Sequence, residues 1–254
     1  MIFTISVDCK NVINLVKGVG FNLEDATDCF RNGNRIVCKD DRVISINWSS
    51  MKLNGSISAT AIPSSIVILN MDNNTLTGPI PELPTGIKEL YLEKNRLTGP
   101  IPPIPLTMLF YRASNNMLNG SIPSLPPNLT FFGVPQNNLV NTIPTLPSTL
   151  NHLDLANNQL GGNIPTLTRS LYRLKLRNNN LNGSIPDLIH SNIAFLHLGF
   201  NRLTGTIPYL SLTLNKIDLG NNQLSGTIPS LPSKLIVLNL SNNQLEHFPL
   251  FQIS

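Results

Sequence analysis

The 254-residue sequence is poor in several features that would indicate particular classes of protein. Only 13% of its residues are charged, and like charges do not cluster in blocks, so a net charge of +4 does not demand a nucleic-acid partner. No apolar run reaches the ~18 residues that a membrane-spanning helix needs. The low charge comes with 40 leucines, which argues against a disordered chain.

Motifs of catalysis and cofactor binding are also missing. The sequence has no GxGxxG, P-loop, HExxH or CxxC pattern. Its histidines are scattered, at His152, His190, His197 and His247. The repeat described below places His152 and His197 two strands apart, ~9–10 Å, and Asp154 and Asp218 three strands apart, ~14 Å. These separations suit neither a metal site nor a glycosidase pair. We therefore expect no metal, no cofactor and no enzymatic activity.

What the sequence has in abundance is a repeat. Its 40 leucines, 34 asparagines, 20 prolines and 16 glycines recur with a period of mostly 21 residues, as in LNHLDLANNQLGGNIP at 150–165. Ten units fit between residues 43 and 249, with one extra residue in Asp187–Asn192. Evenly spread prolines exclude a helical bundle. Leucines that alternate with period two predict a short strand with one buried face, which must be covered by neighbouring units.

The motif LxxLxLxxNxLxGxIP resembles the leucine-rich repeat family, and its Gly-x-Ile-Pro end is similar to the plant-type subclass. The unit is about three residues shorter than is usual there. Several units also continue as Ile-Pro-x-Leu-Pro, which is similar to short bacterial repeats. The resemblance implies a leucine-rich repeat solenoid, a right-handed superhelix of the α/β class by convention. Its concave side would be a parallel β-sheet of about ten strands, and its convex side extended, polyproline-like or 3-10 backbone with little helix.

One asparagine in each unit stands where the chain leaves the strand. We expect its amide to bond backbone groups of its own turn and the next, which forms a structural ladder. The ladder consists of Asn74, Asn95, Asn116, Asn137, Asn158, Asn179, Asn201, Asn222 and Asn243. A glycine four residues later in most units predicts a bend or a close backbone approach.

Residues 1–42 do not follow the repeat and are expected to form an N-terminal cap over the first unit. They hold all three cysteines, Cys9, Cys29 and Cys38, and resemble the cysteine-paired cap of secreted plant and fungal relatives, with Phe30 where that cap has a further cysteine. The resemblance implies a Cys9–Cys29 disulfide, proximity favours Cys29–Cys38, and the thiols could also stay reduced. Residues 250–254 would be a short C-terminal end without a cysteine cap.

The compartment is expected to be extracellular or the cell surface, with the cytoplasm as the alternative. No leader is visible, because the apolar start at 1–7 is short and lacks a basic residue. Sequons for N-glycosylation occur at Asn47, Asn54, Asn73, Asn119, Asn128, Asn182 and Asn239. An asparagine-rich repeat also creates such sequons by composition. Glycans on Asn47 and Asn239 would confine a ligand to the middle of the concave face.

Side chains between the core leucines of each strand must point into the concavity. In units three to seven these positions carry aromatic residues beside a basic row, and both kinds are common in binding hot spots. The predicted ligand-binding residues are Tyr91, Phe110, Arg112, Phe131, His152, Asp154, Arg173, Lys175, Arg177, Phe195, His197 and Phe200. Asp154 and Lys175 would form a cross-strand pair.

These observations favour a non-enzymatic recognition module that binds a protein, a peptide or a glycan on its concave face. One alternative is an extracellular structural or inhibitor protein, because the Gly-x-Ile-Pro motif and the cysteine-containing start resemble polygalacturonase-inhibiting proteins. A cytosolic scaffold is another. We expect neither nucleic-acid binding nor insertion into a membrane.

Overall fold

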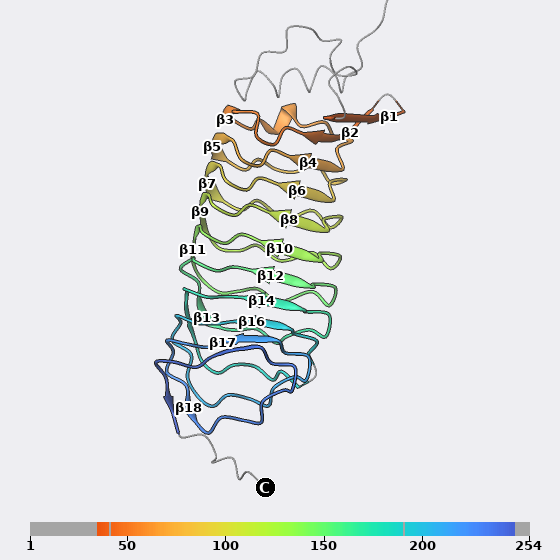
Figure 1. Ribbon diagram of the computed structural model, residues 1–254. Helices are drawn as coiled ribbons and strands as arrows, with labels where there is room; N and C mark the ends of the chain where they lie inside the picture. Colours follow the sequence, from red (N-terminus) through yellow and green to blue (C-terminus); the bar gives the residue numbers. More distant parts are fainter. Residues whose placement is uncertain (1–34, 41, 190, 247–254) are drawn as a thin grey trace, which may run out of the picture. The chain divides into compact units, whose positions relative to one another are not determined.

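The computed structural model describes residues 35–40, 42–189 and 191–246, which fall into two compact units, Met1–Leu129 and Thr130–Ser254. Each unit is a β-solenoid whose turns each add one strand to a parallel sheet (Figure 1). The expected fold class, a leucine-rich repeat solenoid, is therefore confirmed. Most of the predicted cap, with Cys9 and Cys29, and the end at 250–254 lie outside the described residues, so the cap and its disulfides stay predictions.

In the first unit, the main sheet has the order β2–β4–β6–β8, all parallel, and β1 pairs antiparallel with β2. These strands are β1 (Ile36–Lys39), β2 (Arg42–Asn47), β4 (Ile68–Asn70), β6 (Glu89–Tyr91) and β8 (Phe110–Arg112). A second, lateral sheet has the order β3–β5–β7–β9. Its strands are β3 (Asn54–Ser56), β5 (Thr75–Pro79), β7 (Arg96–Pro100) and β9 (Met117–Gly120). A single 3-10 turn, η2 (Ala59–Ala61), lies in the first repeat.

In the second unit, the main sheet has the order β10–β12–β14–β16–β17–β19. These strands are β10 (Phe131–Gly133), β12 (His152–Asp154), β14 (Arg173–Lys175), β16 (Phe195–His197), β17 (Lys216–Asp218) and β19 (Val237–Asn239). The lateral strands are β11 (Asn138–Leu139), β13 (Gly161–Asn163), β15 (Asn180–Asn182), β18 (Ser225–Gly226) and β20 (Gln244–Leu245). Among them β13 pairs with β15, and β18 pairs with β20.

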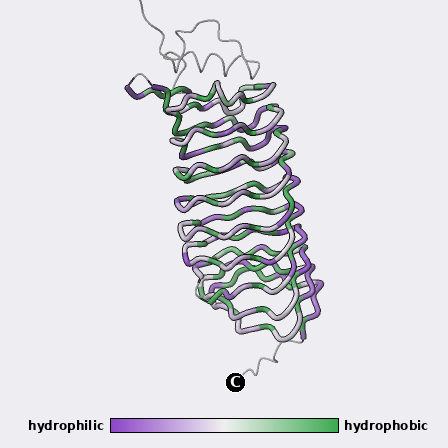
Figure 2. Tube along the Cα trace, turned by 180° about the vertical axis from the view of Figure 1, so that it is seen from behind, coloured by the Kyte–Doolittle hydropathy of each residue, from purple (hydrophilic) through white to green (hydrophobic). Residues whose placement is uncertain are grey.

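Alternation along each main strand builds the core. The middle residue of a main strand points inward, so Leu153, Leu174 and Leu196 expose at most 1% of their surface. Hydrophobic and hydrophilic stretches accordingly alternate along every turn (Figure 2). Burying one leucine side chain completely contributes about 1.5–3 kcal/mol to the free energy of folding. The stacked turns, rather than any single repeat, hold the fold together.

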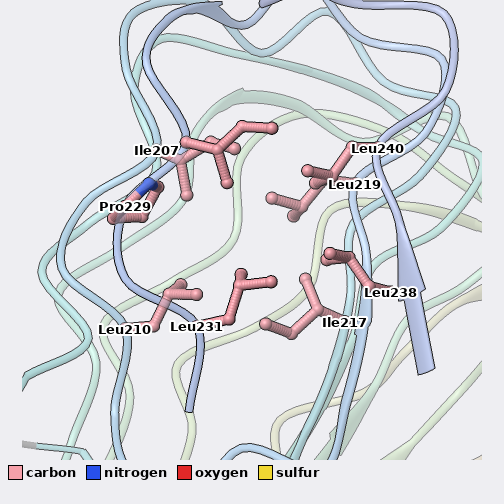
Figure 3. A pocket seen from close by; sticks show the side chains of 9 residues that line it. Ile207, Leu210, Ile217, Leu219, Pro229, Leu231, Leu238 and Leu240 are labelled. Carbon is pink, nitrogen blue, oxygen red and sulfur yellow. The ribbon is translucent and has the colours of Figure 1, made fainter. Parts of the chain in front are cut away.

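The interior near the last described turns is packed and is not a ligand cavity. Figure 3 shows Ile207, Ile217 and Leu238 among apolar side chains that point toward one another from successive turns. The space between them admits no water molecule. In the last of these turns Leu238 and Leu240 are only half-buried, whereas the equivalent Leu174 and Leu176 are at most 1% exposed.

The asparagines of the ladder join adjacent turns through their amides. Asn158 Oδ1 accepts from the backbone N–H of Leu139 at 3.0 Å, and its Nδ2 donates to Val134 O at 3.0 Å and Leu155 O at 3.1 Å. Leu139 and Val134 belong to the preceding turn, so the expectation that the amide would reach the next turn was wrong in direction. The side chain closes a tight buried turn whose N–H and C=O groups would otherwise lack partners.

The residue before each ladder asparagine adopts a left-handed conformation. Its φ lies between 52° and 58° in nine successive turns, and asparagine occupies six of these positions, with lysine, glutamine and phenylalanine at Lys94, Gln136 and Phe200. A second left-handed position follows the ladder and is glycine in most turns, with φ of 78° at Gly99. Asn141 takes that place in one turn with φ of 67°. Glycine and asparagine accept this region at the least steric cost.

Extended backbone on the return side was expected, and η2 is the sole helix within the described ranges. The lateral strands were not expected. They comprise two to five residues each, and their x-Leu-x-Gly pattern is too short to show alternation. The described part of the chain contains no helix long and apolar enough to cross a bilayer.

Candidate functional site

The main sheet of the second unit presents one face to solvent, and we call this surface the open face. It consists of the outward-pointing residues of β10, β12, β14, β16 and β17, together with Tyr172 directly before β14, Arg177 two residues after β14 and Phe200 three residues after β16. Parallel register aligns Phe131, His152, Arg173, Phe195 and Lys216 in one row. A neighbouring row runs through Gly133, Asp154, Lys175, His197 and Asp218. Each row therefore repeats at the strand spacing of ~4.8 Å.

Aromatic rings form a continuous run across this face. The ring of Phe131 stacks on His152, with centroids 5.6 Å apart, and His152 lies 5.9 Å from Tyr172. Tyr172 in turn meets Phe195 edge to face at 5.5 Å. Such geometries are favourable for aromatic pairs. A Cβ added to Gly133 would lie 2.8 Å from the ring of Phe131, so the glycine leaves the space in which that ring lies.

Arg173 contacts this run at Phe195. Its guanidinium carbon is 4.5 Å from the centroid of Phe195, a cation–π contact. The Nε atom of Arg173 is buried and makes no hydrogen bond with any described residue. A buried N–H without an acceptor is costly. Arg173 and Lys216 form no ion pair within the part of the chain that the structure describes.

The other two cations of the open face are paired. Lys175 Nζ lies 3.0 Å from Asp154 Oδ2, which is the cross-strand pair that the sequence indicated. Arg177 pairs with Asp218, which lies two main strands further along, and stacks on Phe200 with its guanidinium carbon 4.4 Å from the ring centroid. Four cations thus share the face with two carboxylates, and the face carries a net positive charge.

His197 lies between Lys175 and Asp218 in the second row. Burial lowers the pKa of its imidazole below the ordinary value, the carboxylate of Asp218 opposes this change, and the charges of Lys175 and Arg173 reinforce it. The imidazole is therefore neutral at physiological pH and does not add to the positive charge of the open face.

The first unit carries a different set of charges on its own main sheet. Tyr91 donates a hydrogen bond to Glu89 Oε2 at 2.8 Å, and burial together with this carboxylate raises the pKa of Tyr91 to about 12. Asp72 accepts a hydrogen bond from the backbone N–H of Glu93 at 2.6 Å, and burial raises the pKa of Asp72 to about 6. Arg112 is 3.9 Å from Glu93. This face is acidic where the open face is basic.

The predicted ligand residues are therefore divided between the units. Tyr91, Phe110 and Arg112 belong to the first unit, and the others gather on the open face of the second. Sequence reasoning missed Tyr172, because it stands directly before its strand and outside the outward-pointing positions Arg173, Lys175 and Arg177. A signal was available, since Tyr172 is the one aromatic residue at this position among the turns of the second unit.

The sequons differ in how their side chains are used. Asn239 donates to Asp218 Oδ1 at 2.8 Å, and Asn73 donates to Ser50 Oγ at 2.9 Å. In contrast, three are exposed at equivalent positions of lateral strands, each outside the main sheet of its own unit: Asn54, Asn119 and Asn182.

Comparison with known proteins gives a family match and a set of similar folds. A family model described as Leucine Rich Repeat matches residues 149–171, 170–192, 213–235 and 234–254. A search of curated proteins gives no significant match.

Three solved structures illustrate the structural similarity. A plant ice-binding protein has a TM-score of 0.79 at 24% identity, with 94% of this chain and 86% of that protein covered. A TDR receptor has a TM-score of 0.62 at 27% identity, with 80% of this chain and 44% of the receptor covered. The plant peptide hormone receptor RGFR1, in complex with RGF2, has a TM-score of 0.50 at 28% identity, with 76% and 42% covered. The chain spans less than half the length of these two receptors.

Proposed function

We propose that this chain, in which four stretches match the Leucine Rich Repeat model, is a non-enzymatic recognition module that binds an extended peptide or protein segment on the open face of its second unit. The proposal accounts for a surface of half-buried and exposed aromatic and guanidinium groups that the fold itself does not require. A glycan is the competing ligand, and the experiment below separates the two.

The observation that carries this proposal is the state of Arg173. Its guanidinium carbon lies 4.5 Å from the centroid of the Phe195 ring, and its Nε is buried without an acceptor in the described part of the chain. A planar guanidinium fixed in this way presents its remaining N–H groups as a fork for a carboxylate or a pair of carbonyl oxygens. An extended peptide offers such oxygens and places side chains on the aromatic run beside them.

The receptor comparisons support the peptide over other ligands. The RGFR1 structure is described as a peptide hormone receptor in complex with RGF2, and it shares 28% identity with this chain. Leucine-rich repeats also serve unrelated functions, so the fold adds support only together with the open face. We also propose an extracellular location, with glycans on Asn54, Asn119 and Asn182, whose side chains are exposed on lateral strands.

The test starts from the purified chain and a displayed library of random peptides. Selected peptides are synthesised, and their affinity is measured by fluorescence anisotropy. Arg173→Ala should weaken binding by about 10–30-fold, as expected for a hot-spot arginine. Arg202→Ala is the matched control, because Arg202 is exposed on the lateral side and donates there to Asn180. This control should bind as the wild type does.

Two results would overturn the proposal. One is equal binding by wild type and Arg173→Ala, which would place the ligand elsewhere. The other is failure of the library to yield a specific peptide while immobilised oligosaccharides bind in an Arg173-dependent manner, which would make the module a glycan receptor. For the location, intact mass with and without glycosidase treatment should reveal added glycan on protein from its native source.

A further inference from the structure

Phe200 adopts a backbone conformation that does not suit its side chain. Its φ is 56°, in the left-handed region, where a bulky residue is an outlier. The other turns of the second unit fill this position with asparagine or, at Gln136, with glutamine. Asparagine tolerates the left-handed region because its short polar side chain can hydrogen-bond locally. Phenylalanine has no such compensation.

Phe200 also interrupts a regular set of hydrogen bonds. Asn178 Nδ2 donates to Asn157 Oδ1 of the preceding turn at 3.0 Å, and Asn242 Nδ2 donates to Asn221 Oδ1 at 2.8 Å. Phe200 occupies the turn between these two pairs, so it can neither accept from Asn221 nor donate to Asn178. The amide row therefore has a gap at the turn where the ring stands.

The ring is nevertheless fixed in place. The guanidinium of Arg177 lies 4.4 Å from its centroid, and Asp218 holds that guanidinium by an ion pair. The Arg177–Asp218 ion pair crosses over β16, which lies between β14 and β17. Gly199 makes this contact possible because it has no side chain. A Cβ on Gly199 would approach the Asp218 carboxylate to 2.9 Å. Phe200 remains 43% exposed, so part of the ring stays open to solvent.

From this geometry we infer that Phe200 is an anchor of the ligand site, and that the partner places an apolar side chain, aliphatic, aromatic or proline, against its open surface. Strained backbone persists where the surroundings enforce it, and it gathers at binding sites. Here the backbone hydrogen bonds of the turn enforce it, from the Phe200 N–H to Gly220 O at 2.8 Å and from the Asn179 N–H to Phe200 O at 3.2 Å. The ring itself stays partly exposed, so the fold does not bury it in return. The inference rests on the proposed function and adds the kind of side chain that the partner must carry.

Stability gives the first test and needs no ligand. Phe200→Asn installs the residue that neighbouring turns carry, relieves the strain and restores the amide row. We expect its Tm to equal that of the wild type or to rise by up to ~4 °C. Asn178→Phe is the matched control, since it creates the same strain one turn earlier without the support of Arg177, and its Tm should fall by about 2–4 °C. A fall of more than ~2 °C in Phe200→Asn would assign the ring a structural role and overturn the inference.

Binding gives the second test, with the peptides selected from the random library on the wild type. Phe200→Asn should lower the affinity for these peptides by at least about 10-fold, and the selected peptides should share one position that carries an apolar side chain. If Arg173→Ala abolishes binding and Phe200→Asn does not, the assignment of Phe200 as an anchor is wrong while the proposed function stands. If neither substitution matters, or no peptide is selected, both are wrong.

Discussion

At the scale of single residues, the buried asparagines connect the turns most directly. Replacement of Asn158 by alanine leaves the N–H of Leu139 and the carbonyls of Val134 and Leu155 without its amide. We expect Asn158→Ala to lower the free energy of unfolding by about 3 kcal/mol, because unsatisfied buried groups are costly. Urea denaturation measures this. The exposed Asn180→Ala should change it by less than about 0.5 kcal/mol. A loss below about 1 kcal/mol in Asn158→Ala would contradict the role of the ladder.

Asp72 predicts a pH dependence at the same scale. Its pKa is raised to about 6, chiefly by burial, although the hydrogen bond from the Glu93 amide opposes the rise. The folded chain therefore retains a proton that the unfolded chain has lost, so Asp72 destabilises the fold increasingly as pH rises from about 4 to about 6.

Asp72→Asn keeps the oxygen that accepts from Glu93 and removes the charge. With solvent screening of this partly exposed group, we expect the substitution to raise the free energy of unfolding by about 1 kcal/mol near pH 7.5. Near pH 4 the gain should vanish, as both forms are then neutral in the folded chain. Urea titrations at the two pH values give the comparison, and an equal gain at both would show that the charge is not the cause.

The sequence predicted some of these residue roles and not others. The asparagine column was visible from its period, because one residue type recurred at one place in every turn. The direction of its hydrogen bonds was not, since either neighbouring turn satisfies the same pattern. Phe200 was visible as an exposed aromatic residue, but its strain was not, because the strain depends on the left-handed backbone angle that the structure shows at this position.

At the scale of elements, the bend before each return segment depends on a left-handed residue. Gly99 has φ of 78°, and Gly99→Ala should lower the free energy of unfolding by about 1–2 kcal/mol. Gly99→Asn should cost less, since Asn141 occupies the equivalent position. Gly86→Ala is the control, because it has no positive φ and the nearest atom to an added Cβ is 3.9 Å away, so it should be neutral or stabilising by up to ~1 kcal/mol. Urea denaturation of the three variants measures these changes. Equal losses of stability in Gly99→Ala and Gly86→Ala would show that the left-handed conformation of Gly99 is not the cause.

The main strands could be predicted from the sequence, and the lateral strands could not. Leucine alternation specifies the main strands, because it places one residue of each strand in the core. The lateral strands are specified by pairing between turns, as in Thr98 beside Met117 of β9, and pairing leaves no periodic mark within one repeat. Likewise, the aromatic run needs Tyr172, whose place beside His152 follows from side-chain direction and not from spacing.

At the scale of the whole molecule, stability should vary along the stack, because each turn contacts only its neighbours. In the second unit, Leu171, Leu174 and Leu176 are at most 1% exposed, while Leu238 and Leu240 are half-buried. We expect backbone amides of β19 and β20 to exchange with deuterium faster than those of β12 and β14. Hydrogen-exchange mass spectrometry tests this, and uniform protection would indicate that the unit opens in a single cooperative step.

The backward direction of the asparagine bonds has a consequence for how such a chain can change in length. Each turn supplies the amide that completes the turn before it, and every copy supplies it from the same place in the repeat. An in-frame duplication of one 21-residue unit would bring its own amide for the preceding copy and receive one from the copy that follows. A gene that encodes this repeat can therefore gain or lose whole units without leaving a backbone group unpaired, and the main sheet lengthens or shortens by one strand at each event.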